Sequence, residues 1–119
     1  MEKNKVLSML GLARRAGKLA MGHDAALSAV LDKKAALLIL TSDTSDRLHR
    51  EFKTAMERNG INIPVLIPDI TISEIHYSCG YKAGVIAVND ENFSKKIISL
   101  TEEQIINSFG RNSIYGNKG

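Results

Sequence analysis

Residues 17–24, with the sequence Gly-Lys-Leu-Ala-Met-Gly-His-Asp, place two glycines around a very short strand candidate. The second glycine, Gly22, stands where a helix is expected to begin. Such a helix directs free backbone N–H groups and a partial positive charge outward, which suits an anion. Arg14, Arg15 and Lys18 bring cationic side chains to the same stretch. The pattern predicts a binding site for a polyanion, and we expect RNA.

The same residues also have a purely structural interpretation. Gly22 can serve only to relieve strain in a turn, and Lys18 can be simply solvated. Arg14 and Arg15 would complement the dipole at the end of a helix whether or not RNA is present. His23 and Asp24 could cap the next helix. The sequence leaves both interpretations open.

A second candidate contact is the loop between Gly80 and Gly84, which contains Tyr81 and Lys82. A tyrosine in a loop flanked by glycines can stack on an extruded base, and the lysine can neutralise a phosphate. The alternative is a flexible connector that carries a surface tyrosine.

Signals for catalysis or metal binding are sparse. Cys79 and His76 would share one face of a helix, and they are the only nucleophile and base that the spacing pairs. A lone cysteine in a short helix is usually a small core side chain. One cysteine and three histidines cannot form a zinc finger, and no phosphate-binding or dinucleotide-binding glycine motif is present. We therefore expect no enzymatic activity, no cofactor and no metal.

Composition fits one globular domain of 119 residues with a net charge of +3. The basic excess lies in residues 1–59, which hold 11 Lys/Arg against 7 Asp/Glu, whereas residues 60–119 hold 5 against 6. The single cysteine excludes an internal disulfide and favours a cytoplasmic location. No apolar run approaches the length of a membrane span.

Helical and strand patterns alternate along the chain, which predicts a sheet between two helical layers. Residues 1–100 are expected to form the domain, and residues 101–119 a C-terminal extension. In that extension Thr101 would cap a short helix with Ile105, Ile106 and Phe109 on its apolar side, before a mobile tail. Helices are expected over 4–16, 23–33, about 48–59, 71–80 and 90–100, and strands over 18–21, 35–40, 63–67 and 84–88.

The segment Leu10–Leu19, with the sequence Leu-Gly-Leu-Ala-Arg-Arg-Ala-Gly-Lys-Leu, resembles a family of small bacterial proteins. These are the YlxQ-type members of the kink-turn RNA-binding ribosomal-protein family, the L-seven-Ae and L-thirty-e type. The resemblance continues through Gly22, the pair Ala29-Val30 and the strands at 37–40 and 84–88, and covers about residues 3–99. It implies a three-layer α-β-α sandwich with a small mixed four-stranded sheet, and a non-catalytic RNA-binding protein.

The resemblance also implies how RNA would be held. The turn at Gly22 and the following helix would enter the groove beside tandem G·A pairs of a kinked RNA, while the 80–84 loop packs on a flipped-out nucleotide. The family's guanine-reading Asn and Glu, and a nearby Lys, align here with Asp24, Ala25 and Ser28. The residues expected to bind RNA are Arg14, Arg15, Lys18, Gly22, His23, Asp24, Ala25, Ser28, Gly80, Tyr81 and Lys82.

The expected partner is a structured RNA with a kink or internal loop, ribosomal RNA being one candidate. Asp24 can accept hydrogen bonds from guanine but cannot donate to its O6, and Ala25 can do neither. These substitutions leave an alternative open, in which the same fold serves as a protein–protein interaction module that has lost kink-turn specificity. The sequence indicates no oligomeric state.

Overall fold

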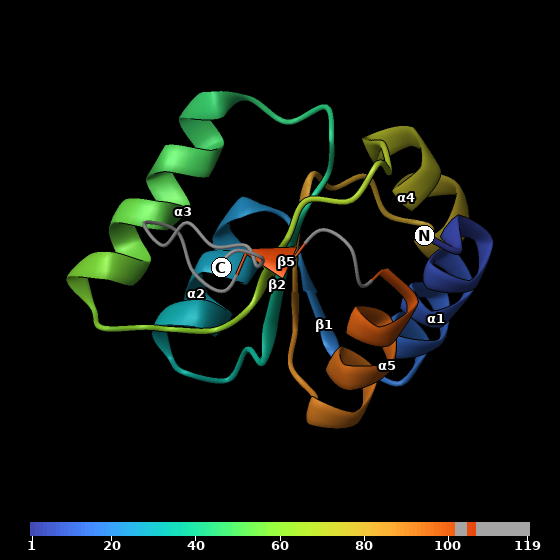
Figure 1. Cartoon of the computed structure of the whole chain (residues 1–119), viewed down its shortest axis with the longest axis horizontal. Coiled ribbons are helices and arrows are strands. Elements are labelled where there is room, and N and C mark those ends of the chain that lie inside the picture. Colours follow the sequence, from blue (N-terminus) through green and yellow to red (C-terminus); the bar gives the residue numbers. More distant parts are fainter. Residues whose placement is uncertain (102–104, 107–119) are drawn as a thin grey trace.

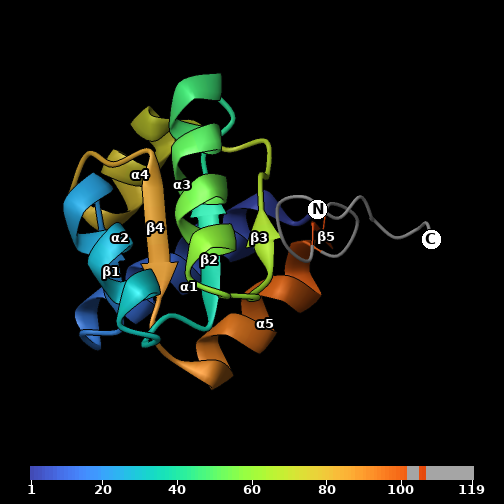
Figure 2. The ribbon, with the colours of Figure 1, turned by 90° about the vertical axis from the view of Figure 1, so that its left-hand side faces the viewer.

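The computed structural model describes residues 1–101 and 105–106, and it places a mixed sheet between two layers of helices (Figures 1 and 2). The elements alternate along the chain as the sequence pattern predicts. In chain order they are α1 (Lys3–Arg15), β1 (Leu19–Met21), α2 (His23–Leu31), β2 (Leu37–Leu40), α3 (Asp46–Arg58), β3 (Val65–Leu66), α4 (Ile72–Cys79), β4 (Val85–Val88), α5 (Glu91–Thr101) and β5 (Ile105–Ile106).

The sheet has the order β1-β4-β2-β3-β5, so β4 lies between β1 and β2 although it follows them in the chain. The β2–β3 pair is parallel, and the other pairs are antiparallel. Met21 at the end of β1 faces Ile86 near the start of β4. This register brings the start of α2, which follows β1, next to the 80–84 loop, which precedes β4.

Successive side chains along each strand point to opposite faces of the sheet, so each strand contributes to two separate cores. On β2, Leu37 and Ile39 pack with α1, α4 and α5, while Leu38 and Leu40 pack with α2 and α3. All four side chains are almost completely buried. A short apolar run thus forms a central strand covered on both faces, as expected for residues 35–40.

The expected three-layer sandwich and mixed sheet are therefore confirmed, with one correction at the C-terminal end. Ile105 and Ile106, expected in a helix, instead pair with Leu66 and Val65 as the two-residue strand β5. Thr101 ends α5 rather than capping a new helix. Backbone pairing to an open sheet edge satisfies N–H and C=O groups that a single helical turn would leave free. Phe109 and the tail expected after it lie outside the described residues.

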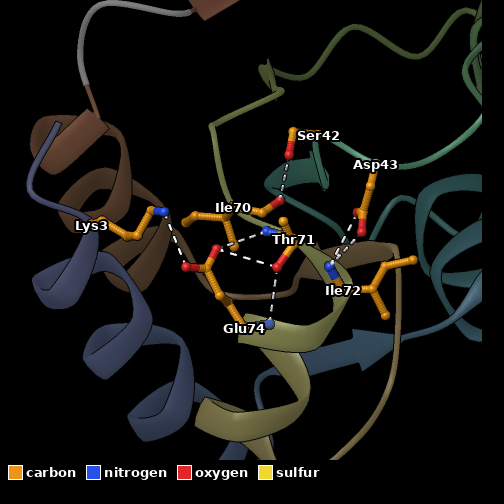
Figure 3. Close-up of polar contacts among 7 residues, drawn as sticks. All are labelled: Lys3, Ser42, Asp43, Ile70, Thr71, Ile72 and Glu74. Atoms are coloured by element: carbon orange, nitrogen blue, oxygen red, sulfur yellow. Dashed lines mark hydrogen bonds and ion pairs between the residues drawn. The ribbon is translucent and has the colours of Figure 1, made fainter.

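Side chains cap three of the helices at their N-termini. The expected capping box of α4 is present: Thr71 Oγ1 accepts from the Glu74 N–H at 3.2 Å, and Glu74 Oε1 accepts from the Thr71 N–H at 3.0 Å (Figure 3). Ser45 caps α3 by accepting from the Leu48 N–H, and Asp90 caps α5 by accepting from the Phe93 N–H. The start of α2 differs from all three.

Candidate nucleic-acid interface

Helix α2 begins at Gly22, whose backbone has φ +96° and ψ 168°. This region of backbone space is open essentially to glycine alone. Glycine brings no side-chain oxygen, and within the described part of the chain no side chain caps α2. The alternative in which His23 or Asp24 caps this helix is therefore wrong. The helix start keeps the positive end of its dipole without the side-chain acceptor that α3, α4 and α5 receive.

Three segments that are distant in sequence meet at this helix start. The Arg14 guanidinium, at the end of α1, lies 5.1 Å from the centre of the Tyr81 ring, a cation–π distance. A Cβ atom added to Gly22 would lie 3.8 Å from the ring and from the hydroxyl of Tyr81. Arg14 Nη1 also lies 3.3 Å from the Met21 sulfur. We call Arg14, Gly22 and Tyr81 the α2 corner.

The sheet explains why these segments meet. The Gly22 N–H donates to the Val85 carbonyl at 2.9 Å, which extends the β1–β4 ladder to the residue directly before α2. The loop before Val85 must therefore pass beside Gly22. Gly80 starts that loop in the left-handed conformation, with φ 77°, and so ends α4. Tyr81 follows at once and remains nearly half exposed.

His23 bridges the start of α2 to α3. Its Nδ1 lies 2.8 Å from Asp24 Oδ1, and its Nε2 lies 2.7 Å from Glu51 Oε2. Its ring also meets Phe52 edge-on, with ring centres 5.6 Å apart. The hydrogen bonds to Asp24 and then Glu51 raise the pKa of His23 above its ordinary value. A protonated His23 would offset part of the acidic charge beside the α2 corner.

Asp24, Ala25 and Ser28 lie on the exposed side of α2, whereas Ala26, Ala29 and Val30 are buried. The Asp24 side chain is fully exposed. Ser28 lies 3.4 Å from Asp32, one turn further along the helix. The positions aligned with the family's base readers therefore face outward, and their chemistry here is one carboxylate, one methyl and one hydroxyl.

Other expected contact residues lie further away. The Lys18 carbonyl accepts from the Asn89 N–H at 2.8 Å, which places Lys18 at the opposite end of β1 from Gly22. The three intervening residues of extended chain separate the two by about 13 Å. The Arg15 guanidinium lies beside Gly11, where α1 approaches Ser78 of α4. Gly80 and Lys82 are exposed in the loop. Residues 17–24 therefore do not form a single compact binding site.

Sequence reasoning missed Glu51 and Met21 as neighbours of this corner. Glu51 reaches His23 across 28 residues, from a different helix, and no local pattern indicates such a pair. Met21 could have been found, because it is seven residues from Arg14 and directly precedes Gly22. Its thioether fits beside a guanidinium that also lies over an aromatic ring.

The residues considered for catalysis show no nucleophile poised to react. Cys79 is half-buried, and this burial raises the pKa of its thiol, which disfavours the reactive thiolate. Within the described ranges, no group of three or more His, Cys, Asp and Glu side chains is arranged to hold a metal ion. The helices of the described chain are all too short or too polar to cross a bilayer.

Comparison with known proteins identifies two relatives named "RNA-binding protein YlxQ". The protein from Bacillus subtilis (strain 168) is 32% identical over 95 residues, which cover 79% of this chain and 92% of the relative. The one from Enterococcus faecium is 25% identical over 100 residues, covering 84% and 94%. No family model matches the chain.

Two solved structures share the fold. A protein of unknown function from Bacillus halodurans C aligns with a TM-score of 0.72 and 31% identity, over 83% of this chain and 98% of that one. The Giardia lamblia 15.5kD RNA binding protein aligns with a TM-score of 0.62 over 84% and 87%. Its identity is 18%, so that likeness concerns the architecture alone.

Proposed function

The chain belongs to the YlxQ family, and on that premise we propose that it is a non-catalytic protein that binds a structured RNA at the α2 corner. Two relatives named as RNA-binding proteins support RNA as the partner. The observation that carries the site is the uncapped N-terminus of α2, with Arg14 and Tyr81 directly beside it. We place the activity in the cytoplasm, with ribosomal RNA as one candidate partner.

Phosphate binding is the first element of the proposal. Backbone N–H groups at a helix start and the positive end of the helix dipole favour an anion without any side-chain participation. The guanidinium of Arg14 adds a fixed positive charge and donors that match phosphate oxygens. These contacts would position the RNA, but they carry no information on its sequence.

Shape selection is the second element. Tyr81 presents a partly exposed ring beside the helix start, and an extruded base of a kinked or looped RNA can stack on it. The Arg14 guanidinium lies over this ring, 5.1 Å from its centre. A straight duplex keeps its bases stacked inside, so it offers nothing to Tyr81. The proposed preference is therefore for an RNA that already contains a kink or an internal loop.

Base reading at α2 is the part that distinguishes this chain from the family pattern. The exposed Asp24 carboxylate can accept from the N–H groups of a guanine edge. Ala25 offers no polar group, and Ser28 carries no positive charge. We infer that selectivity depends more on the shape of the RNA than on guanine edges.

A binding comparison tests this function. Fluorescence anisotropy with a kink-turn RNA and a straight duplex of equal length should show tighter binding to the kinked RNA. Arg14→Gln should weaken that binding, whereas Lys34→Gln, which removes an exposed cation far from the corner, should not. No binding to either RNA at low salt would contradict the proposal and favour the protein-interaction alternative.

A further inference from the structure

The outer face of α3 carries a row of arginines. Arg47, Arg50, Thr54 and Arg58 follow one another at intervals of three, four and four residues, so their side chains share one face of the helix. All four are exposed, and they line a shallow groove together with Glu51, Ala55 and Asn59. We call Arg47, Arg50 and Arg58 the arginine stripe.

The arginine stripe has no counter-charge among residues 1–101 and 105–106. No carboxylate of those residues lies within ion-pair distance of its guanidinium groups. Glu51 is the acid closest to the centre of this face. Its Oε2 lies 2.7 Å from His23 Nε2, so this carboxylate pairs with His23 rather than with an arginine. Asp46 and Glu57 lie to one side and pair with no arginine there. Among the described residues, the stripe is therefore an exposed row of positive charge without an ion-pair partner.

Helix stability explains only part of this arrangement. Arg58 is in the last turn of α3, where a cation complements the dipole. Arg47 is in the first turn, where a cation faces the positive end of the dipole and is unfavourable. Arg50 gains nothing from either end. A ligand with negative charge would account for all three.

The arginine stripe is continuous with the α2 corner. His23 is the first residue of α2, and it reaches Glu51 and Phe52 in the middle of α3. Both helices lie on the same face of the sheet, side by side in Figures 1 and 2. At 1.5 Å per residue, the stripe extends over about 16 Å of helix. A ligand held at α2 that continued in this direction would pass over α3.

We propose that the arginine stripe binds the phosphate backbone of a helical stem that leaves the RNA held at the α2 corner. The inference rests on the proposed function and adds a second contact surface to it. Guanidinium groups bind phosphate oxygens strongly and with defined geometry. Because phosphates carry no base identity, this surface adds affinity to a stem of any sequence.

The test compares two triple variants with equal loss of charge. Arg47→Gln/Arg50→Gln/Arg58→Gln removes the stripe, and Lys34→Gln/Lys95→Gln/Lys96→Gln removes three exposed lysines elsewhere. Each variant is titrated with two kink-turn RNAs in separate experiments. One RNA has long stems, and the other has stems cut to a few base pairs. The affinity is measured between about 50 and 200 mM salt. On the long-stem RNA, the stripe variant should reduce the magnitude of the negative slope of log affinity against log salt by about 2–3 units.

The control variant should leave that slope unchanged, and the effect of the stripe variant should disappear with short stems. A wild-type slope in the stripe variant, together with weaker binding by Arg14→Gln, would overturn the inference while the proposed function stands. An equal loss on both RNAs would also overturn it, since the arginines would then act on the kink. If the wild-type protein binds neither kink-turn RNA, both proposals fail. Unchanged thermal unfolding of each variant verifies the fold.

Discussion

The N-termini of α2 and α4 both leave backbone N–H groups without partners inside the helix, but only α4 receives side-chain acceptors for them. At α4, Thr71 and Glu74 cap each other's backbone N–H groups, and the Asp43 carboxylate accepts from the Ile72 N–H at 3.1 Å (Figure 3). Lys3 then pairs with Glu74 at 3.0 Å, which joins the cap to α1. At α2, Gly22 supplies no acceptor. The N–H groups at the start of α4 are therefore bonded within the protein, whereas the start of α2 has no side-chain acceptor among the described residues.

On the proposed function, the α4 start contributes to stability and the α2 start to binding. A side-chain cap contributes about 1 kcal/mol to a helix, and α2 gives up that contribution. Its start instead depends on a backbone conformation that only glycine adopts readily, with Tyr81 and Arg14 close by. The α4 cap lies on the other face of the sheet, where the helices pack on one another. Changes at the two sites should therefore affect different properties.

The largest expected effect is that of Gly22→Ala. An alanine must adopt the φ of +96° at a cost of about 1–3 kcal/mol, and its Cβ would contact Tyr81. We expect both a lower melting temperature and weaker binding to a kink-turn RNA. Gly60→Ala, also at positive φ but with open space around it, is the matched control and should lower stability alone. Equal RNA affinity in the Gly22→Ala and wild-type proteins would contradict the assignment of α2.

Tyr81→Ala should weaken RNA binding by about 1–3 kcal/mol, the loss expected when a stacked base loses its aromatic partner. Its ring is partly exposed, so thermal unfolding should change little. Tyr81→Phe keeps the ring and should retain most of the affinity, which separates stacking from hydrogen bonding by the hydroxyl. Tyr77→Ala, which removes an almost fully exposed tyrosine from α4, serves as the control.

Thr71→Ala should have the opposite pattern of effects, on stability rather than on RNA binding. It removes the side-chain cap of α4, and we expect the free energy of unfolding to fall by about 1 kcal/mol in urea titrations. RNA affinity should stay at the wild-type value. Weaker RNA binding by a Thr71→Ala protein that remains folded would contradict the assignment of stability to the α4 start and of RNA binding to the α2 start.

The smallest expected effect concerns pH. The pKa of His23 is raised, because its protonated form bonds Asp24 and Glu51. The stabilisation is therefore fully present below its unfolded pKa of about 6.5, and it is lost as pH rises through the higher folded pKa. RNA affinity should fall as pH rises over the same range, because His23 loses its positive charge beside the α2 corner. A His23→Gln protein should show a flatter pH profile in anisotropy titrations, and an identical profile would exclude His23 as the cause.

Local sequence signals predicted most of the fold. The apolar run before Thr41 becomes the central strand β2, and the pattern Thr71-Ile72-Ser73-Glu74 becomes the capping box. Both depend on neighbouring residues only, which is why the sequence suffices. The strand at Ile105–Ile106 depends on pairing with β3, a distant partner that no local pattern specifies.

The candidate site was less predictable for the same reason. The sequence grouped Arg14 with Gly22 and treated Tyr81 as a second candidate contact, but the contact of Tyr81 with the other two follows from the β1–β4 register. It also grouped Lys18 with Gly22, although a strand of three residues holds them apart. The pairing of His23 with Glu51 is set by the packing of α2 on α3. Proximity in sequence was a poor guide wherever an extended strand intervened.

On the proposed function, the start of α2 is open to RNA and the start of α4 is closed. Backbone amide NMR spectra, recorded while a kink-turn RNA is added, test this directly. We expect large shifts for the amides of His23, Asp24 and Ala25, and little change for those of Ile72, Ser73 and Glu74. Shifts confined to α4, or unshifted α2 amides in a saturated complex, would contradict it.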